Sequence, residues 1–379
     1  MQECIRGGCG VSEAELKHTA EASARQFAVE GKLVCVEPYG SGHIHDTFCA
    51  EFTGAGENAS ARRRVILQRM NERIFRDLPG LMDNIERVTK HLAGKVAGEP
   101  ESDRRALRLI PTRDGAKWLR DDNGSAWRAY WMIERARTVD AVSVPEQAFE
   151  SGKAFGEFQK MLADLPAPRL HETIPDFHHT PKRFAALARA IEQDAVNRAK
   201  AAEAEIAFAL AQEPMTRVLL EAGLPERVTH NDTKINNVML DEATGEGVCV
   251  IDLDTVMPGL ALYDFGDMVR TATNLTAEDE CDLNKVRMEF GLYEALLRGY
   301  LTTAGGFLTQ EERRLLAFSG RLITFEIGMR FLTDYLEGDR YFKVHHEGQN
   351  LDRCRTQFAL ARSVAVQEER MNRLAETLG

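Results

Sequence analysis

The stretch that decides the fold lies in the middle of the chain and reads His230-Asn231-Asp232-Thr233-Lys234-Ile235-Asn236-Asn237. Apolar residues 238–240 follow directly. After a turn at 241–247 comes a second apolar run, which ends in Asp252-Leu253-Asp254. The loop carries no apolar periodicity, whereas the run before Asp252 has the length and composition of a buried strand. The pattern therefore predicts a polar loop, a hairpin turn and a strand that ends at Asp252.

The residue types in this stretch suit phosphoryl transfer to a hydroxyl group. A hydroxyl must lose its proton as it attacks the γ-phosphate of ATP, and a neighbouring carboxylate can accept that proton. The phosphates also need Mg²⁺, a hard cation that prefers oxygen ligands such as an Asn amide and an Asp carboxylate. On this interpretation Asp232 is the base, and Asn237 and Asp252 hold the metal. The alternative is a plain polar surface loop before a hairpin.

A second acidic motif, Asp264-Phe265-Gly266, spells the metal-binding triplet of protein kinases. Asp252 is better placed for the metal, because it follows the polar loop after a single hairpin. We therefore interpret residues 263–267 as structural, namely as the start of a helix whose side chains cap orphan N–H groups.

Residues 230–237 and 251–254 resemble the aminoglycoside phosphotransferase and choline kinase superfamily. Two further segments make the resemblance narrower, towards the N-acetylhexosamine 1-kinases: Tyr39-Gly40-Ser41-Gly42-His43-Ile44-His45-Asp46-Thr47 and Arg330-Phe331-Leu332-Thr333-Asp334-Tyr335-Leu336-Glu337-Gly338-Asp339-Arg340-Tyr341-Phe342. The resemblance spans about residues 36–360. It implies Mg²⁺- and ATP-dependent phosphorylation of the anomeric hydroxyl of N-acetylglucosamine or N-acetylgalactosamine.

The expected fold is a two-lobed, protein-kinase-like α+β fold. Residues 1–135 should form a small N-lobe with an antiparallel sheet and a glycine loop that binds the nucleotide. Residues 136–379 should form a larger, mainly helical C-lobe with the catalytic loop, the metal site and the sugar pocket. The expected strands are 32–37, 47–52, 64–68 and 127–133, and the expected helices are 12–29, 79–95, 146–162, 181–213, 284–300, 311–337 and 352–378.

Composition limits the class of protein. The 379 residues are 44% hydrophobic and 28% charged, as in an ordinary globular protein, and the formal net charge is −11. An acidic chain disfavours nucleic acid as a partner. No signal peptide and no membrane span are expected. The seven cysteines form no C-x-x-C pair, so we expect a reduced, cytoplasmic protein. Its partner should be a small-molecule substrate, and its state a monomer or weak homodimer.

The nucleotide-binding residues are expected in the first lobe. A glycine-containing turn between two strands lets backbone N–H groups approach the phosphates of ATP. A kinase places a lysine on the third strand, but here Gln68 takes that place, with Glu86 as a candidate partner or simply an exposed helical residue. The resemblance puts adenine against backbone groups near residues 132–134. The expected nucleotide contacts are Gly40, Gly42, His43, Gln68, Met132 and Glu134.

The acceptor pocket is expected in the second lobe. Arg330 lies among apolar helical residues, where a charge needs a partner or a ligand. Tyr341 follows a turn, where its ring can pack on a sugar face. The resemblance implies that Arg330, Tyr341 and His43 line the hexosamine pocket beside Asp232. The alternative for Arg330 is a structural salt bridge with Asp334, one turn further on. Adjacent His178 and His179, with no third ligand nearby, do not predict a zinc site.

Two other functions stay open from the sequence. The same fold could phosphorylate an aminoglycoside, choline or another amino alcohol. A cationic acceptor would need several carboxylates in its pocket, where the chain instead carries Arg330. A non-catalytic nucleotide-binding protein is the third reading, and the missing strand lysine is its support.

Overall fold

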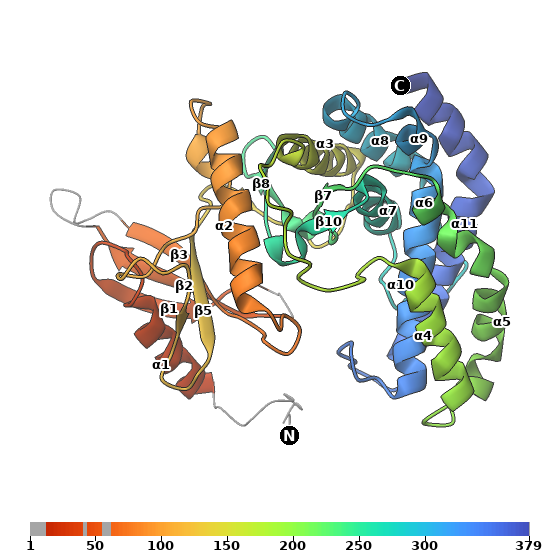
Figure 1. The fold of residues 1–379 in the computed structure, drawn as a ribbon, viewed down its shortest axis with the longest axis horizontal. Coiled ribbons are helices and arrows are strands. Elements are labelled where there is room, and N and C mark those ends of the chain that lie inside the picture. Colours follow the sequence, from red (N-terminus) through yellow and green to blue (C-terminus); the bar gives the residue numbers. More distant parts are fainter. Residues whose placement is uncertain (1–12, 41–43, 55–61, 379) are drawn as a thin grey trace. The chain divides into compact units, whose positions relative to one another are not determined.

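The computed structural model describes residues 13–40, 44–54 and 62–378 (Figure 1). Contacts between residues divide the chain into two compact units, Met1–Glu134 (unit 1) and Arg135–Gly379 (unit 2). No helix among the described residues is long and apolar enough to cross a membrane.

Unit 1 is built on a five-stranded sheet in which every neighbouring pair is antiparallel. The strands lie in the order β1-β2-β3-β5-β4. Their bounds are β1 Leu33–Pro38, β2 Asp46–Thr53, β3 Arg62–Arg69, β4 Leu119–Arg120 and β5 Ala126–Trp131. The four predicted strands are all present, although β5 ends before residues 132–133. The two-residue edge strand β4 carries too little pattern to be found from sequence.

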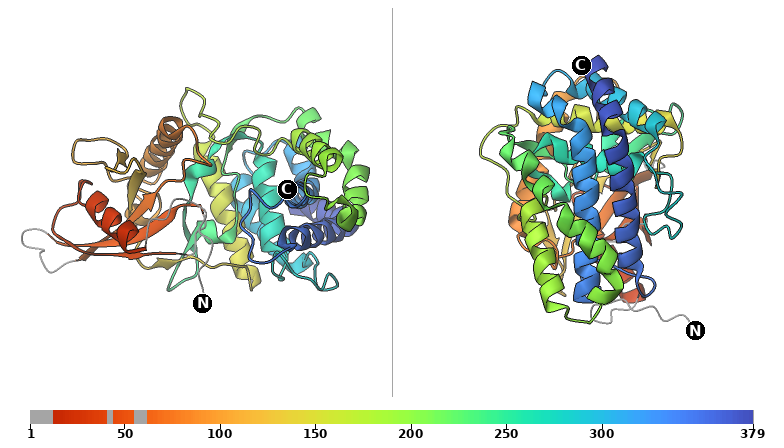
Figure 2. Two further views of the ribbon diagram at one scale, coloured as in Figure 1. Left: turned by 90° about the horizontal axis from the view of Figure 1, so that it is seen from below. Right: turned by 90° about the vertical axis from the view of Figure 1, so that its right-hand side faces the viewer.

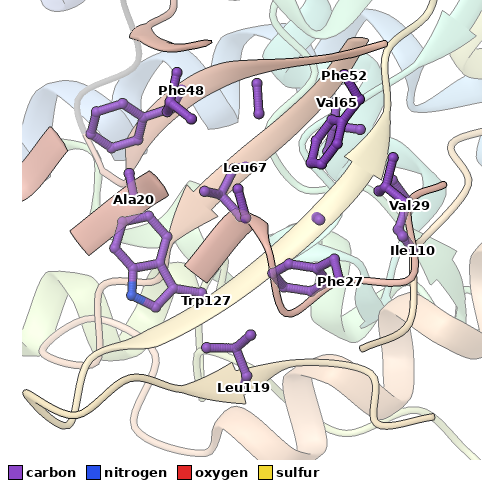
Figure 3. Close-up of a cluster of buried hydrophobic side chains, with 14 of the residues drawn as sticks. Ala20, Phe27, Val29, Phe48, Phe52, Val65, Leu67, Ile110, Leu119 and Trp127 are labelled. Carbon is purple, nitrogen blue, oxygen red and sulfur yellow. The ribbon is translucent and has the colours of Figure 1, made fainter. Parts of the chain in front are cut away.

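The core of unit 1 lies between the sheet and helix α1, Glu13–Ala24. Side chains that alternate along the strands supply it, because successive residues of a strand point to opposite faces. Figure 3 shows these side chains, among them Phe48, Phe52 and Leu67, gathered on one face of the sheet with Trp127. The residues between them in sequence therefore face the other side of the sheet.

Helix α2, Leu78–Lys95, also belongs to unit 1. Asp77 caps it by accepting the Gly80 N–H at 3.0 Å, and a proline in the first turn leaves no extra N–H unpaired. Leu81, Ile85 and Val88 recur at helical spacing and are buried, as predicted.

Unit 2 contains two small sheets that carry the polar loop. One has the order β6-β8-β9, with β6 Ala136–Arg137, β8 Val238–Asp241 and β9 Gly247–Val250. The other pairs β7, Arg227–Thr229, with β10, Met257–Gly259. The hairpin β8–β9 is the one predicted from the turn at 241–247.

Helices form the rest of unit 2 (Figure 1). Helix α10 is buried along most of its length and packs against α4, α7 and α11. Figure 2, in its right-hand view, shows the long helices of this unit running side by side. Their bounds are α3 Pro145–Leu162, α4 Thr180–Gln193, α5 Glu203–Ala211, α6 Val218–Glu221, α7 Ala261–Ala272, α8 Phe290–Ala304, α9 Gln310–Arg314, α10 Leu316–Glu337 and α11 Gln349–Leu378.

Several predicted helix bounds were wrong. The helix expected over 181–213 is broken after α4, because Asp194 and Asn197 adopt left-handed φ angles of 35° and 58°. The Asp194 carboxylate then accepts the N–H groups of Arg198 and Ala199, which starts a new helical segment. Alanine-rich periodicity concealed this break. The helices expected at 12–29 and 284–300 are shorter, and the one expected at 311–337 is divided at Leu315.

Candidate active site

The polar loop of residues 230–237 leaves β7 and returns through a short 3-10 turn, Ile235–Asn237, into β8. Asn231 adopts a left-handed φ of 65°, which an L-residue other than glycine rarely takes. Its side-chain amide donates to the Thr255 carbonyl at 2.8 Å, which helps to hold this conformation. Such strained positions concentrate at functional sites, because the surrounding structure must stabilise them.

Helix α7 holds the loop through two buried carboxylates. Asp264 accepts the N–H groups of His230 at 2.9 Å and Asn231 at 2.7 Å, and Asp267 accepts that of Thr233 at 2.9 Å. The motif at 264–266 is therefore structural, but it does not cap its own helix, since the N-cap is Leu260. Burial raises the pKa of Asp264, while its N–H donors act in the opposite direction.

Asp267 is charged because of its neighbour. Burial alone would raise the pKa of its carboxyl, but the Arg270 guanidinium, 2.8 Å away, holds that pKa below its usual value. The Thr233 N–H group of the loop is therefore held by a negatively charged carboxylate on α7.

Asp232 projects from this loop and remains partly accessible, with 22% of its side chain exposed. One carboxylate oxygen lies 3.0 Å from Lys234 Nζ, and the other accepts the Asn237 amide N–H at 3.1 Å. The negative charge of Asp232 raises the pKa of Lys234. Asp232 and Asn237 are therefore brought together as predicted, and Lys234 joins them.

Asn237 and Asp252 lie at the same end of the β8–β9 hairpin. The ladder pairs Val238 with Val250, and the Ile251 N–H donates to the Asn237 carbonyl at 2.9 Å, one residue before Asp252. Asp252 takes a left-handed φ of 61°. The His230 side chain also contacts this end of the hairpin, since its Nε2 atom lies 2.9 Å from the Ile251 carbonyl oxygen.

The donor set fits a magnesium ion. The Asn237 amide nitrogen donates to Asp232, so the amide oxygen of Asn237 points away from Asp232. Among the described residues, no group of three or more His, Cys, Asp or Glu side chains could hold a metal. Mg²⁺ does not need such a cage, because it is usually bound by one or two protein oxygens together with phosphate oxygens and water.

A second cluster in unit 2 surrounds Arg330 on α10. Its guanidinium carbon lies 5.1, 5.8 and 5.7 Å from the ring centres of Phe177, Tyr341 and Phe342, respectively. The structure therefore brings together the predicted pair Arg330 and Tyr341, and Tyr341 is 58% exposed. Aromatic faces attract the guanidinium and hold it in place without neutralising it.

The alternative of a salt bridge between Arg330 and Asp334 is wrong. The Asp334 carboxylate accepts the backbone N–H groups of Arg340, Tyr341 and Phe342 at 2.8–2.9 Å. It is thereby committed to holding the turn that presents the two rings. No ion pair joins it to Arg330 among the described residues.

Arg183 of α4 stands beside this cluster. Its guanidinium donates to the Phe177 carbonyl at 3.0 and 3.2 Å, and the Phe177 ring contacts Arg330. Burial and the charge of Arg330 lower the pKa of Arg183, although arginine stays protonated at neutral pH. Both guanidinium groups therefore contact Phe177, Arg183 at its carbonyl and Arg330 at its ring.

In unit 1, Gln68 lies in a polar row on the sheet face opposite the α1 core. It pairs in register with Thr47 of β2 and Arg128 of β5. Its amide oxygen accepts from Arg128 Nε at 2.9 Å, and its amide nitrogen donates to Thr47 Oγ1 at 3.3 Å. Glu86 does not partner Gln68, since it forms ion pairs with Lys117 and with Lys90.

Of the other predicted nucleotide contacts, the structure describes Gly40, Met132 and Glu134. Gly40 has a left-handed φ of 76°, and a Cβ there would meet nothing within 4 Å. Gly42 and His43 lie outside the described residues. The Met132 N–H donates to the Arg64 carbonyl, and the Glu134 carbonyl accepts from Arg104. The Met132 carbonyl and the Glu134 N–H take part in no hydrogen bond within the described chain.

Sequence reasoning missed four residues of these clusters: Lys234, Arg183, Phe177 and Arg128. Lys234 had a local signal, because it follows Asp232 by two positions in an otherwise uncharged loop. The others reach their sites through tertiary packing of separate helices or strands, which a single sequence does not display.

A profile of the phosphotransferase enzyme family, abbreviated APH, matches residues 36–307. The fold resembles a microcompartment-associated aminopropanol kinase, with a TM-score of 0.56 and 14% identity over 93% of this chain and 98% of that one. It also resembles an aminoglycoside phosphotransferase from Alicyclobacillus acidocaldarius, with a TM-score of 0.57 and 12% identity over 94% and 96%.

A third solved structure, spectinomycin phosphotransferase in complex with ADP and spectinomycin, matches with a TM-score of 0.53 and 10% identity over 95% of this chain and 99% of that one. At these identities the likeness shows the fold alone. Together with the family match, it establishes that the chain belongs to the phosphotransferase enzyme family and has its kinase-like α+β fold.

Proposed function

We propose that this protein transfers the γ-phosphoryl group of ATP to the anomeric hydroxyl of an N-acetylhexosamine, giving N-acetylhexosamine 1-phosphate and ADP. The observation that carries the proposal is the juxtaposition of Asp232 with Lys234 and Asn237 on a rigidly held loop. The acceptor class rests on the Arg330 cluster and on the resemblance of residues 39–47 and 330–342 to N-acetylhexosamine 1-kinases.

Asp232 is the proposed base. As the anomeric oxygen attacks the γ-phosphorus, its proton passes to the Asp232 carboxylate, and the bond from the phosphorus to the bridging oxygen breaks to release ADP. An anomeric hydroxyl is more acidic than an ordinary alcohol, so a modest base suffices. Lys234, whose Nζ lies 3.0 Å from an Asp232 carboxylate oxygen, places a positive charge beside the reacting group.

Asn237 and Asp252 are the proposed ligands of Mg²⁺, which neutralises charge on the phosphates when it is bound. Both are fixed by the backbone at one end of the β8–β9 hairpin. Pre-organised ligands of this kind lose little freedom when the metal and nucleotide arrive.

In unit 1 the Gln68–Arg128 pair is the proposed replacement for the missing strand lysine. Arg128 holds and polarises the Gln68 oxygen, so the Gln68 amide nitrogen is directed towards Thr47 at the base of the loop that contains Gly40. One of the two amide hydrogens has no partner among the described residues and can be donated to a phosphate. The Met132 carbonyl and Glu134 N–H form the proposed contacts with adenine.

The acceptor pocket disfavours an amine. Arg183 and Arg330 both carry positive charge beside Phe177, Arg183 at its carbonyl and Arg330 at its ring, and a cationic acceptor would be repelled there. Sugar hydroxyls and an acetamido oxygen accept hydrogen bonds from guanidinium groups, and a sugar face can pack on the exposed Tyr341 ring. Amino alcohols and aminoglycosides are therefore only the second candidate acceptors. Two proteins of similar fold are nevertheless named as an aminopropanol kinase and an aminoglycoside phosphotransferase.

The proposal is tested by measuring ADP release with Mg-ATP and a panel of N-acetylglucosamine, N-acetylgalactosamine, galactose, choline and kanamycin. Turnover confined to the N-acetylhexosamines supports it. Turnover only with choline or kanamycin would keep the catalytic loop and overturn the pocket assignment. Absence of turnover across all acceptors would favour a non-catalytic nucleotide-binding protein.

A further inference from the structure

A buried chain of polar contacts joins helix α10 to the catalytic loop. The His178 Nδ1 atom lies 2.8 Å from a carboxylate oxygen of Glu326, and its Nε2 atom lies 3.2 Å from the Asn231 carbonyl oxygen. Thr180 donates its hydroxyl to the second oxygen of Glu326 at 2.5 Å. Glu326 is fully buried and His178 is 5% exposed, so solvent cannot substitute for these contacts.

The partners fix how many protons this pair carries. A carbonyl oxygen only accepts, and a carboxylate oxygen only accepts, so both nitrogens of His178 must face their partners with a hydrogen between them. The pair therefore holds two protons and is neutral as a whole. Burial alone would raise the pKa of Glu326, but the charge and hydrogen bond of His178 hold it below its usual value.

The contact acts on the peptide group next to Asp232. The N–H of Asn231 is held by Asp264 at 2.7 Å, and its carbonyl is held by His178 at 3.2 Å. That carbonyl belongs to the peptide bond that leads into Asp232. Because a peptide group is planar, fixing its oxygen also fixes the direction in which the Asp232 backbone begins.

The same chain of contacts reaches the acceptor cluster. Phe177, whose ring contacts Arg330, is the residue directly before His178. Glu326 precedes Arg330 by one helical turn on α10, so the two side chains lie on the same face of the helix. Consecutive residues of one loop therefore contact the proposed acceptor arginine and the proposed base loop.

We propose that His178, held by Glu326, is a positioning residue that sets Asp232 relative to the acceptor-binding side chains of α10. The inference rests on the proposed function and extends it, because it names a determinant of catalysis outside the residues that touch substrate. A purely structural role for the pair would affect folding stability without changing the rate of phosphoryl transfer in the folded protein.

The first test removes both polar partners together, so that no buried charge is left alone. The full chain with His178→Phe and Glu326→Leu is compared with the wild type for thermal stability, single-turnover rate, and KM for ATP and acceptor. We expect the rate to fall roughly 10–100-fold, as for a small misplacement of a reacting group, with both KM values within about 3-fold. The matched control is Thr324→Val, on the same helix, whose buried hydroxyl donates to the Gly320 carbonyl at 2.7 Å. Its rate should be unchanged.

A second pair of variants keeps the test decisive if the first variant does not fold. His178→Gln with Glu326→Gln retains an amide N–H that can reach the Asn231 carbonyl, whereas His178→Met with Glu326→Gln does not. We expect the glutamine variant to regain at least about 5-fold in rate over the methionine variant, the two differing at a single side chain. Equal rates in the two folded proteins, or a wild-type rate in the first variant, would overturn the inference.

The outcomes separate this inference from the proposed function. The assay uses whichever acceptor the wild type phosphorylates. If the wild type phosphorylates no acceptor, the proposed function fails and the inference fails with it. If the wild type is active and the variants match it, the inference alone fails.

Discussion

Replacement of Asp232 by Asn should abolish most of the activity while leaving the fold intact. The Asn side chain has the same shape and keeps an oxygen that can accept the Asn237 amide hydrogen, now at 3.1 Å. It loses the ion pair with Lys234, but both partners are partly exposed, so the free energy of unfolding should change by only about 0–1 kcal/mol. Thermal denaturation should therefore give a nearly unchanged Tm.

The rate should respond far more strongly. General-base catalysis typically contributes about 10²–10⁴-fold, which corresponds to roughly 2.7–5.4 kcal/mol of transition-state stabilisation at about 1.36 kcal/mol per decade. Single-turnover kinetics with saturating Mg-ATP and acceptor measure this loss. The control is Asp282→Asn, which breaks a surface pair with Lys285 and should leave the rate unchanged. A folded Asp232→Asn protein with turnover near that of the wild type would refute the assignment of the base.

Three further predictions concern Arg330, Arg128 and the buried ion pair of Glu312 with Arg227. Arg330→Lys should raise the acceptor KM about 10-fold or more, because lysine cannot reproduce the planar contact with three rings; Arg362→Lys on α11, the corresponding contact over Phe208, should leave KM unchanged. Arg128→Met should raise the KM for ATP about 10-fold without altering that for the acceptor. Glu312→Gln should lower Tm at pH 7, because it breaks the pair with Arg227. Burial alone would raise the pKa of Glu312, but the hydrogen bond from Arg227 and its charge hold that pKa below its usual value. The stabilisation that this carboxylate contributes is therefore present above about pH 4.5 and is lost as pH falls through the pKa of the folded state. The difference in Tm between the wild type and the variant should therefore shrink on acidification.

The fold class followed from local patterns. Strand-like segments defined β2, β3 and β5, and helical spacing of apolar residues defined α2. Asp194 shows where this reasoning stops. Its left-handed conformation ends α4 inside an unbroken alanine-rich pattern, because its carboxylate caps the next segment instead. Single-residue capping of this kind competes with helix propensity and leaves no periodic trace.

The candidate site was predictable only where its residues share one segment. Asp232 and Asn237 lie five positions apart on one loop, and their contact could be inferred. Asp264 was assigned to the wrong partner, since its N–H donors lie over 30 positions earlier in the chain. The role of His178 could not be predicted, because its contacts to Glu326 and Asn231 depend on the packing of α10 beside the loop.

The central claim is that the phosphoryl group is transferred to an anomeric oxygen. The most direct measurement is ³¹P and ¹H NMR of the product formed from N-acetylglucosamine or N-acetylgalactosamine with Mg-ATP and the wild-type protein. We expect a phosphorus nucleus coupled to the anomeric proton, in a phosphate that is stable to alkali and labile to acid. A phosphate on another hydroxyl of the sugar, or turnover with amino alcohols alone, would contradict it.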